Sequence, residues 1–189
     1  MTDRKTVAII LAAGLGTRMK SDRPKVMHLL AGQPIVAHLL GTLEPLGLDE
    51  IVVVVGNNME AVTDVVQPHA TVVQSERLGT AHAVLAARDY LESFEGELLV
   101  LYGDTPLVSA PTLEAMLMRL RAPEKPAAIA LGFRPEDPGM YGRLIVEEGG
   151  DLKQIVEARD ATPEQLQVEL CNSGVMALDG ATALNYLSR

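Results

Sequence analysis

Residues 11–25 read Leu11-Ala-Ala-Gly-Leu-Gly-Thr-Arg-Met-Lys-Ser-Asp-Arg-Pro-Lys25 and follow directly on the apolar run Thr6-Val-Ala-Ile-Ile-Leu11. The apolar run has no polar alternation and is partly β-branched, which predicts a buried parallel strand. The chain then turns at Gly14 and Gly16 and delivers a hydroxyl and two cations, Thr17, Arg18 and Lys25. Glycines let backbone N–H groups come close to an anion. The stretch therefore predicts a triphosphate cradle at the end of a strand.

Two better-known glycine loops do not match this stretch. A Walker A loop ends in Gly-Lys-Ser/Thr, which is absent, and a dinucleotide fingerprint needs Gly or Ala where this chain has Met19. An ordinary tight turn with solvated charges is the alternative, and Gly-x-Gly alone would favour it. The preceding strand, Thr17-Arg18 and Pro24-Lys25 together favour the phosphate loop.

Composition limits the class of protein and of ligand. The chain has 189 residues, enough for one domain with a sizeable core, and a formal net charge of −9. That charge, with no Trp and two Phe, predicts that nucleic acid is not a partner. Residues 1–25 nevertheless carry a local excess of cations, which suits a small polyanionic ligand. These cations are Arg4, Lys5, Arg18, Lys20, Arg23 and Lys25.

Location is inferred from the apolar pattern and from cysteine usage. No apolar stretch is long enough to cross a bilayer, and residues 1–6 do not resemble a secretion signal, so no membrane partner is expected. The single cysteine, Cys171, fits a reducing cytoplasm. The four histidines have no zinc-type spacing and are interpreted as surface or packing residues; they are His28, His38, His69 and His82.

Strands and helices are predicted to alternate along the first 120 residues. Strands are expected over 6–11, 51–55, 71–74 and 98–102, and helices over 34–43, 59–67, 81–91 and from Ser109-Pro111 to about 120, with Thr80 as a helix N-cap. This alternation predicts an α/β fold with a doubly wound, mostly parallel sheet. Ligands of such sheets bind beyond the carboxyl ends of the strands, so 14–25, 74–80 and 102–104 are expected on one edge.

The pattern changes from about residue 126. Strands are predicted over 127–133, 141–146, 152–157 and 168–178, and a helix over 181–187. Gly149-Gly150 between the second and third of these strands predicts an added antiparallel hairpin. We expect these strands to extend the sheet and cap the ligand site, so that residues 1–189 form a single domain.

Two groups of polar residues are expected at the ligand edge. Asp104 ends a buried strand, where its carboxylate could hold Mg²⁺ or, equally from the residues alone, stabilise the turn before Thr105-Pro106. Gln74 carries an amide that can pair with a base or a sugar, and Gly79-Thr80 precedes a helix whose free N–H groups can bind a ligand. An ordinary capped helix start is the alternative for Gly79-Thr80.

A third group lies on the later strands and consists of Tyr141-Gly142-Arg143, Glu157 and Asn172. A carboxylate and an amide are natural partners for sugar hydroxyls, because vicinal hydroxyls both donate and accept. Spacing alone favours surface or turn positions for all of them.

The ordered set of motifs resembles the uridylyltransferase (pyrophosphorylase) domain of bacterial bifunctional N-acetylglucosamine-1-phosphate uridylyltransferases. The resemblance runs from residue 5 to the end of the chain. It is carried by Leu11-Ala-Ala-Gly-Leu-Gly-Thr-Arg-Met, Pro24-Lys-Val26, Gln74, Leu78-Gly-Thr-Ala-His-Ala83, Leu101-Tyr-Gly-Asp-Thr-Pro-Leu107, Tyr141-Gly-Arg143, Ile155-Val-Glu157 and Asn172-Ser-Gly174. It implies a Rossmann-like nucleotide-diphospho-sugar transferase fold.

The resemblance also implies a reaction and a site. UTP and N-acetylglucosamine 1-phosphate would give UDP-N-acetylglucosamine, a precursor of peptidoglycan and lipopolysaccharide, and pyrophosphate. Arg18 and Lys25 correspond to the catalytic cations, and Asp104 to a Mg²⁺ ligand. The implied substrate-binding residues are Leu11, Ala12, Ala13, Gly14, Gly16, Thr17, Lys25, Gln74, Gly79, Thr80, Tyr102, Gly103, Asp104, Gly142, Glu157 and Asn172.

The chain departs from the family pattern in two ways. The hexapeptide repeats of the acetyltransferase β-helix are absent, and so is the later Asn that completes the metal site. We therefore expect residues 1–189 to be a nucleotidyltransferase domain truncated at its C-terminal end, monomeric where the full-length family is trimeric. The alternatives are a cytidylyltransferase acting on methylerythritol phosphate and a catalytically silent fragment that binds a sugar nucleotide.

Overall fold

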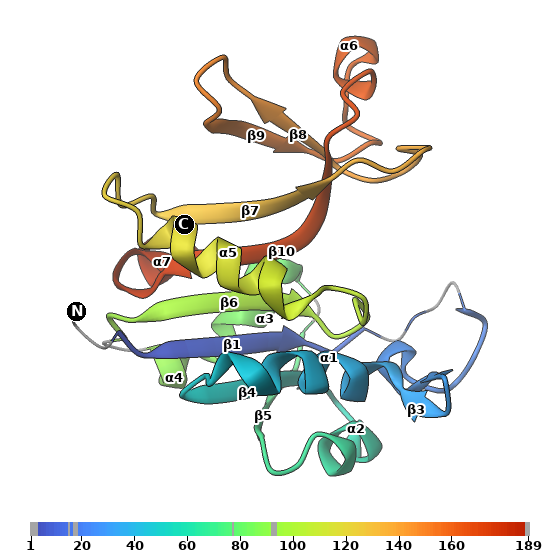
Figure 1. The fold of residues 1–189 in the computed structure, drawn as a ribbon. Helices are drawn as coiled ribbons and strands as arrows, with labels where there is room; N and C mark the ends of the chain where they lie inside the picture. Colours follow the sequence, from blue (N-terminus) through green and yellow to red (C-terminus); the bar gives the residue numbers. More distant parts are fainter. Residues whose placement is uncertain (1–3, 15, 17–18, 77, 92–93, 188–189) are drawn as a thin grey trace. The chain divides into compact units, whose positions relative to one another are not determined.

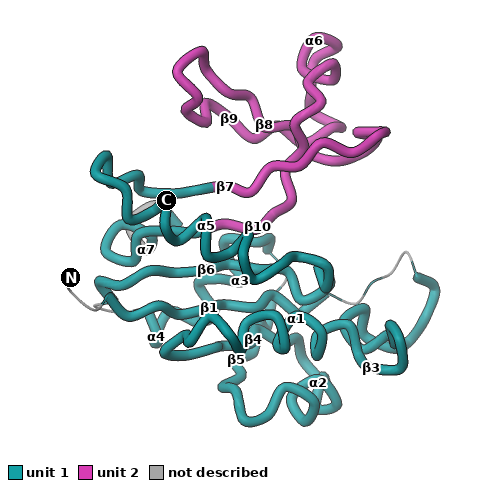
Figure 2. Tube along the Cα trace, viewed as in Figure 1, with its two compact units in different colours: residues 1–129, 177–189 teal, residues 130–176 magenta. Residues whose placement is uncertain are grey.

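The computed structural model describes residues 4–14, 16, 19–76, 78–91 and 94–187. The chain divides into two compact units, residues 1–129 with 177–189 and residues 130–176 (Figure 2). Strands β7 (Ala128–Phe133) and β10 (Cys171–Asp179) run through both units. The single nucleotidyltransferase domain expected over 1–189 stays a prediction.

Parallel strands form the sheet of the first unit, in the order β5-β4-β1-β6. Strand β1 (Thr6–Leu11) lies between β4 (Glu50–Gly56) and β6 (Glu97–Tyr102), and β5 (Ala70–Gln74) pairs with β4. Strands β1, β4 and β6 are buried over almost their whole length, which explains why their sequences are continuous apolar runs. The predicted doubly wound, mostly parallel sheet is confirmed.

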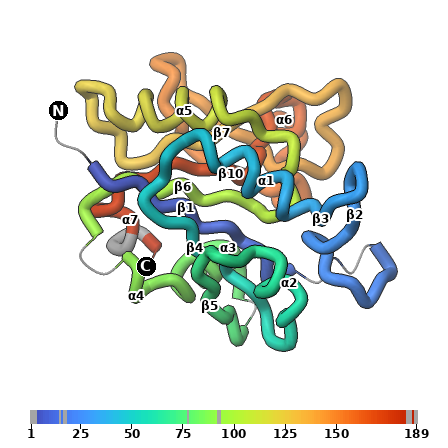
Figure 3. The backbone as a smooth tube through the Cα atoms, turned by 60° about the horizontal axis from the view of Figure 1, so that its bottom comes forward, coloured from blue at the N-terminus to red at the C-terminus, as the bar shows by residue number. Residues whose placement is uncertain are grey.

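Helices cover both faces of this sheet (Figures 1 and 3). Helices α1 (Ile35–Leu43) and α5 (Ala110–Leu120) lie on one face, and α3 (Thr80–Leu85) and α4 (Arg88–Leu91) on the other. Helix α5 begins as predicted, because the Ser109 hydroxyl accepts a hydrogen bond from the N–H of Thr112. The remaining elements of this unit are the 3₁₀ turns η2 (Lys25–Met27) and η3 (Glu44–Leu46), the short strands β2 (Leu29–Leu30) and β3 (Gln33–Pro34), and helices α2 (Glu60–Val65) and α7 (Gly180–Leu187).

The second unit contains the predicted hairpin. Strands β8 (Arg143–Val146) and β9 (Leu152–Val156) pair antiparallel, and Cys171 of β10 pairs with Arg143 of β8. Strand β7 also pairs with β10. A short helix, α6 (Pro163–Leu166), is closed by a reciprocal capping box between Thr162 and Gln165.

The structure corrects three local predictions. Thr80 is not an N-cap but the first residue of α3, and Gly79 takes the cap position at φ 110°, where a left-handed backbone favours glycine. The helix expected over 81–91 is two helices, α3 and α4. Helix α6 occupies residues just before the strand expected from 168, which begins at Cys171. No helix among the described residues combines the length and the apolar character that a bilayer crossing requires.

Candidate active site

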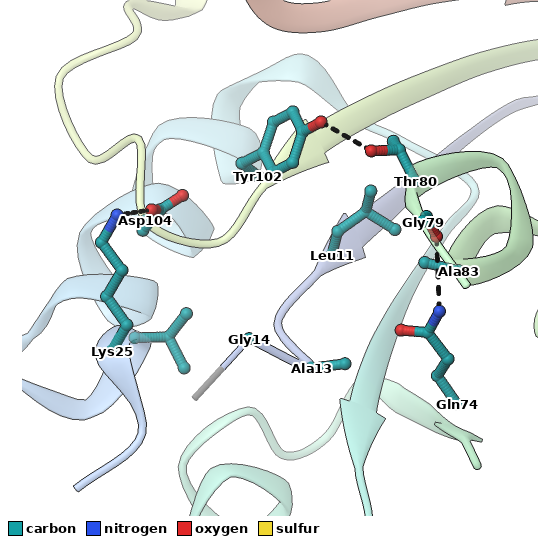
Figure 4. A pocket seen from close by; sticks show the side chains of 11 residues that line it. Leu11, Ala13, Gly14, Lys25, Gln74, Gly79, Thr80, Ala83, Tyr102 and Asp104 are labelled. Atoms are coloured by element: carbon teal, nitrogen blue, oxygen red, sulfur yellow. Dashed lines mark hydrogen bonds and ion pairs between the residues drawn. The ribbon is translucent and has the colours of Figure 1, made fainter. Parts of the chain in front are cut away.

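A pocket of about 300 Å³ opens in the first unit beyond the carboxyl ends of β1, β5 and β6 (Figure 4). Segments far apart in the sequence line this pocket, as the parallel topology predicts. The lining residues are Leu11, Ala13, Gly14, Lys25, Val26, Gln74, Gly79, Thr80, Ala83, Tyr102 and Asp104.

The exit of β1 is held between the neighbouring strands. The N–H of Ala12 donates to the carbonyl of Val54 over 2.8 Å, and the N–H of Gly103 donates to the carbonyl of Leu11 over 2.9 Å. A Cβ on Gly103 would lie 3.0 Å from Val26 Cγ1 and 3.4 Å from Ala12 Cβ, so close packing favours glycine there. Ala12 and Gly103 are thus buried beside the pocket and are not among its lining residues, and their contact with substrate stays a prediction.

Gly16 has a structural reason to be glycine. Its φ is +64°, and a Cβ there would lie 2.7 Å from Cβ of Lys25. The loop can therefore pass close to the Lys25 backbone only without a side chain at position 16. A Cβ at Gly14, in contrast, would meet nothing within 4 Å. Thr17 and Arg18, which were predicted as phosphate contacts, lie outside the described residues.

Lys25 and Asp104 meet at one side of the pocket. The Lys25 ammonium forms an ion pair with the Asp104 carboxylate (Figure 4). Both side chains are partly exposed, so a ligand in the pocket can reach the cation and the carboxylate. The expected proximity of the glycine loop and the end of β6 is confirmed.

A second cluster joins the end of β5, the start of α3 and the end of β6. The hydroxyls of Thr80 and Tyr102 are 2.9 Å apart, and Nε2 of Gln74 donates to the carbonyl of Gly79 over 3.4 Å. Gln74 is 5% exposed, whereas Thr80 is exposed. This cluster offers a hydroxyl pair and a fixed amide to a ligand in the pocket.

The donor set of the pocket bears on the expected Mg²⁺ site. Asp104 is the carboxylate among the pocket-lining residues, and the described part of the chain holds no group of three or more His, Cys, Asp or Glu that could share a metal ion. Magnesium is commonly held by one or two carboxylates together with substrate phosphates and water. One carboxylate beside the glycine loop is therefore compatible with a magnesium ion that is held largely by its substrate.

The second unit brings its own predicted residues together. The N–H of Asn172 donates to the carbonyl of Gly142 over 2.8 Å, and a Cβ on Gly142 would lie 3.6 Å from both carboxylate oxygens of Glu157. Spacing alone favoured surface or turn positions for these residues. They form one cluster, in which Gly142 is buried, Asn172 is half-buried and Glu157 is exposed.

The sequence analysis did not single out two residues that line the pocket and one residue that contacts Gln74. Val26 and Ala83 line the pocket, and His82 contacts Gln74. Val26 follows Pro24-Lys25 directly, and Ala83 lies one turn after Thr80, so both were within motifs already singled out. His82 was interpreted as a surface or packing residue, and only the fold reveals its contact.

The fold and this pocket define the class of protein. The chain belongs to the MobA-like NTP transferase domain family, whose model matches residues 8–167. A structure from Bacillus anthracis named as a glucose-1-phosphate thymidylyltransferase, 18% identical, has the same fold with a TM-score of 0.78, over 95% of this chain and 73% of that one.

Two relatives show which proteins within this class the chain is most readily compared with. The chain is 57% identical over all 189 of its residues to the bifunctional protein GlmU of Paramagnetospirillum magneticum. It is also 57% identical over 184 residues, 97% of the chain, to the bifunctional protein GlmU of Rhodospirillum rubrum. The chain spans 42% and 41% of the length of these relatives.

Proposed function

We propose that this protein transfers a uridylyl group from UTP to N-acetylglucosamine 1-phosphate, giving UDP-N-acetylglucosamine and pyrophosphate. One observation carries the proposal: a single pocket gathers the glycine loop, the Lys25–Asp104 pair and the Gln74–Gly79–Thr80 cluster. Membership of an NTP transferase family and the identity to proteins named GlmU support the same reaction.

The reaction requires the protein mainly to position the two substrates. A phosphate oxygen of the sugar phosphate attacks the α-phosphorus of UTP, and the bond to the bridging oxygen of the leaving pyrophosphate breaks. No covalent intermediate with the protein is needed. The protein contributes by aligning the two substrates and by opposing the negative charge that spreads over the phosphates.

The nucleotide is assigned to the pocket of the first unit. Gly14, Gly16 and Thr17 hold the phosphates, Arg18 opposes charge on the leaving pyrophosphate, and Lys25 does so near the reacting phosphorus. Leu11, Ala13, Gln74, Gly79 and Thr80 receive the nucleoside. The mixed polar and apolar lining of the pocket supports this assignment, because a nucleoside presents both an apolar ring face and a hydrogen-bonding edge.

The sugar phosphate is assigned to Gly142, Glu157 and Asn172. Their contiguity in the second unit supports the assignment, because a carboxylate, an amide and a backbone position lie within reach of one small ligand. Asp104 is the residue that would hold Mg²⁺, and Lys25 neutralises the negative charge of the same carboxylate before the ion binds. Bound Mg²⁺ supplies charge neutralisation on the phosphates.

A substrate panel tests the proposal. The complete encoded protein is incubated with Mg²⁺ and each of UTP, CTP, dTTP, GTP and ATP, with N-acetylglucosamine 1-phosphate or methylerythritol phosphate as acceptor, and pyrophosphate release is measured. Release only with UTP and N-acetylglucosamine 1-phosphate is expected. Release with CTP and methylerythritol phosphate would instead identify a cytidylyltransferase. Calorimetric binding of UDP-N-acetylglucosamine without any turnover would identify a binding protein.

A further inference from the structure

The amide of Gln74 is held by two neighbours at the pocket. Its Nε2 lies 3.4 Å from the carbonyl oxygen of Gly79 and 3.2 Å from Nδ1 of His82. Gln74 ends β5, whereas Gly79 and His82 belong to the start of α3, so a strand end and a helix start hold the amide together. Gln74 is buried, and its amide therefore has little freedom to exchange these partners for water.

The Gly79 carbonyl decides which way this amide is turned. A backbone carbonyl can only accept a hydrogen bond, so the amide atom that faces it is the nitrogen and not the oxygen. The same nitrogen also faces His82, and His82 Nδ1 must then accept. An imidazole that accepts at Nδ1 is neutral and carries its proton on Nε2. The positions of these groups thus specify both the amide orientation and the histidine tautomer.

The amide oxygen is left as the group presented to a ligand. Gln74 lines the pocket, and Oε1 has no hydrogen-bond partner among the described residues. In Figure 4 the nitrogen points to Gly79 and the oxygen is turned away from it. An acceptor in a held position favours a base whose ring nitrogen carries a proton. Uracil has such an N3–H, whereas N3 of cytosine is itself an acceptor.

We propose that His82 is a positioning residue for base selection: it holds the Gln74 amide with the oxygen toward the base and thereby favours an imide base such as uracil over cytosine. The inference rests on the proposed binding of a uridine nucleotide in this pocket. His82 need not touch the substrate. Without it, Gly79 alone opposes rotation of the amide, and a rotated amide would present N–H groups that suit the cytosine acceptor.

The test compares UTP with CTP in the complete encoded protein. For the wild type, His82→Phe and His82→Asn, kcat/KM is measured with each nucleotide, and KM is measured for N-acetylglucosamine 1-phosphate. Phenylalanine keeps a ring but removes the acceptor, whereas the asparagine Oδ1 replaces Nδ1 at the same number of bonds from the backbone. His69→Phe is the matched control, since His69 lies between α2 and β5 and does not line the pocket.

We expect His82→Phe to reduce the preference for UTP over CTP about tenfold, the effect of losing one hydrogen bond between neutral groups. His82→Asn should restore the preference to within about twofold of wild type, and KM for the sugar phosphate should not change in either variant. A preference that survives in His82→Phe, or that falls equally in His82→Asn, would overturn the inference. His82→Ala serves as a second acceptor-free variant if His82→Phe does not fold. A wild type with no preference for UTP would refute the proposed uridine specificity itself.

Discussion

The ammonium of Lys25 contacts the carboxylate of Asp104, and this pair joins the turn after the glycine loop to the end of β6. Lys25 begins the 3₁₀ turn η2, and the glycine loop can pack against it because Gly16 has no side chain. Asp104 follows a strand that is fully buried except at its last residue. A cation and a carboxylate are thus placed in the pocket by two independently anchored segments.

Lys25→Ala should lower kcat for pyrophosphate release by about 10²–10³-fold, because one contact to charge that develops in the transition state is worth ~2.7–4 kcal/mol. Thermal unfolding should change little, since a partly exposed ion pair contributes about 1 kcal/mol at most. Lys153→Ala, in the exposed part of β9, is the control. A Lys25→Ala rate close to wild type would remove Lys25 from the proposed catalytic role.

Asp104→Asn should raise the Mg²⁺ concentration needed for half-maximal rate about tenfold or more, because a neutral amide replaces the anionic ligand. Initial rates measured over a Mg²⁺ titration at saturating UTP provide the comparison. Asp151→Asn, in the exposed turn of the β8–β9 hairpin, should leave the titration unchanged. An unchanged Mg²⁺ requirement in Asp104→Asn would show that another group holds the ion.

Arg143→Met should destabilise the second unit and weaken sugar-phosphate binding. Arg143 is 3% exposed, and its guanidinium donates to the carbonyls of Pro138, Gly139 and Tyr141. These bonds hold the loop that leads into Gly142. Because three part-buried carbonyls lose the charged donor that a buried guanidinium supplies, we expect a loss of about 2–3 kcal/mol in the free energy of unfolding.

Urea unfolding measures the loss of stability in Arg143→Met, and steady-state kinetics should show a raised KM for the sugar phosphate with KM for UTP unchanged. Arg134→Met is the matched control, because Arg134 is 64% exposed and pairs with Glu169 at the surface. Its effect should stay within about 0.5 kcal/mol. Equal effects of the two variants would show that the buried guanidinium does not hold the loop.

Arg121→Met should destabilise the first unit. Glu97 is fully buried at the start of β6, and both of its carboxylate oxygens accept hydrogen bonds from Arg121, at 2.7 and 2.6 Å. These hydrogen bonds raise the pKa of Arg121 above its ordinary value. Removal of the arginine leaves a buried carboxylate with the Thr6 hydroxyl as its remaining hydrogen-bond partner among the described residues.

We expect Arg121→Met to cost about 2–3 kcal/mol, less than the ~3–5 kcal/mol of a fully buried pair because Arg121 itself is half exposed. Chemical denaturation measures the change. Arg119→Met, two residues earlier, breaks a surface pair with Glu124 and should change stability by about 0.5 kcal/mol or less. The role of the Glu97–Arg121 pair would be refuted by equal midpoints in the two variants.

The central strands of the parallel sheet could be predicted from the sequence for a physical reason. A parallel strand covered on both faces must be apolar at every position, so β1, β4 and β6 appear as uninterrupted runs whose bounds match the prediction within a residue. The glycine loop was likewise readable, because Gly16 meets a local steric demand that no other residue satisfies without strain. Local signals failed where two of them competed, as at Gly79 and Thr80, where the positive φ of the glycine displaced the hydroxyl from the cap.

The sequence by itself thus determined the class of fold, the glycine loop after β1 and the residue types around the pocket. Only the tertiary structure decided which of these residues touch. The Lys25–Asp104 pair and the Thr80–Tyr102 contact each join segments that are far apart in the sequence and whose approach depends on strand order. Burial and periodicity act between neighbours along the chain, whereas these contacts arise when the sheet brings distant strand ends to one edge.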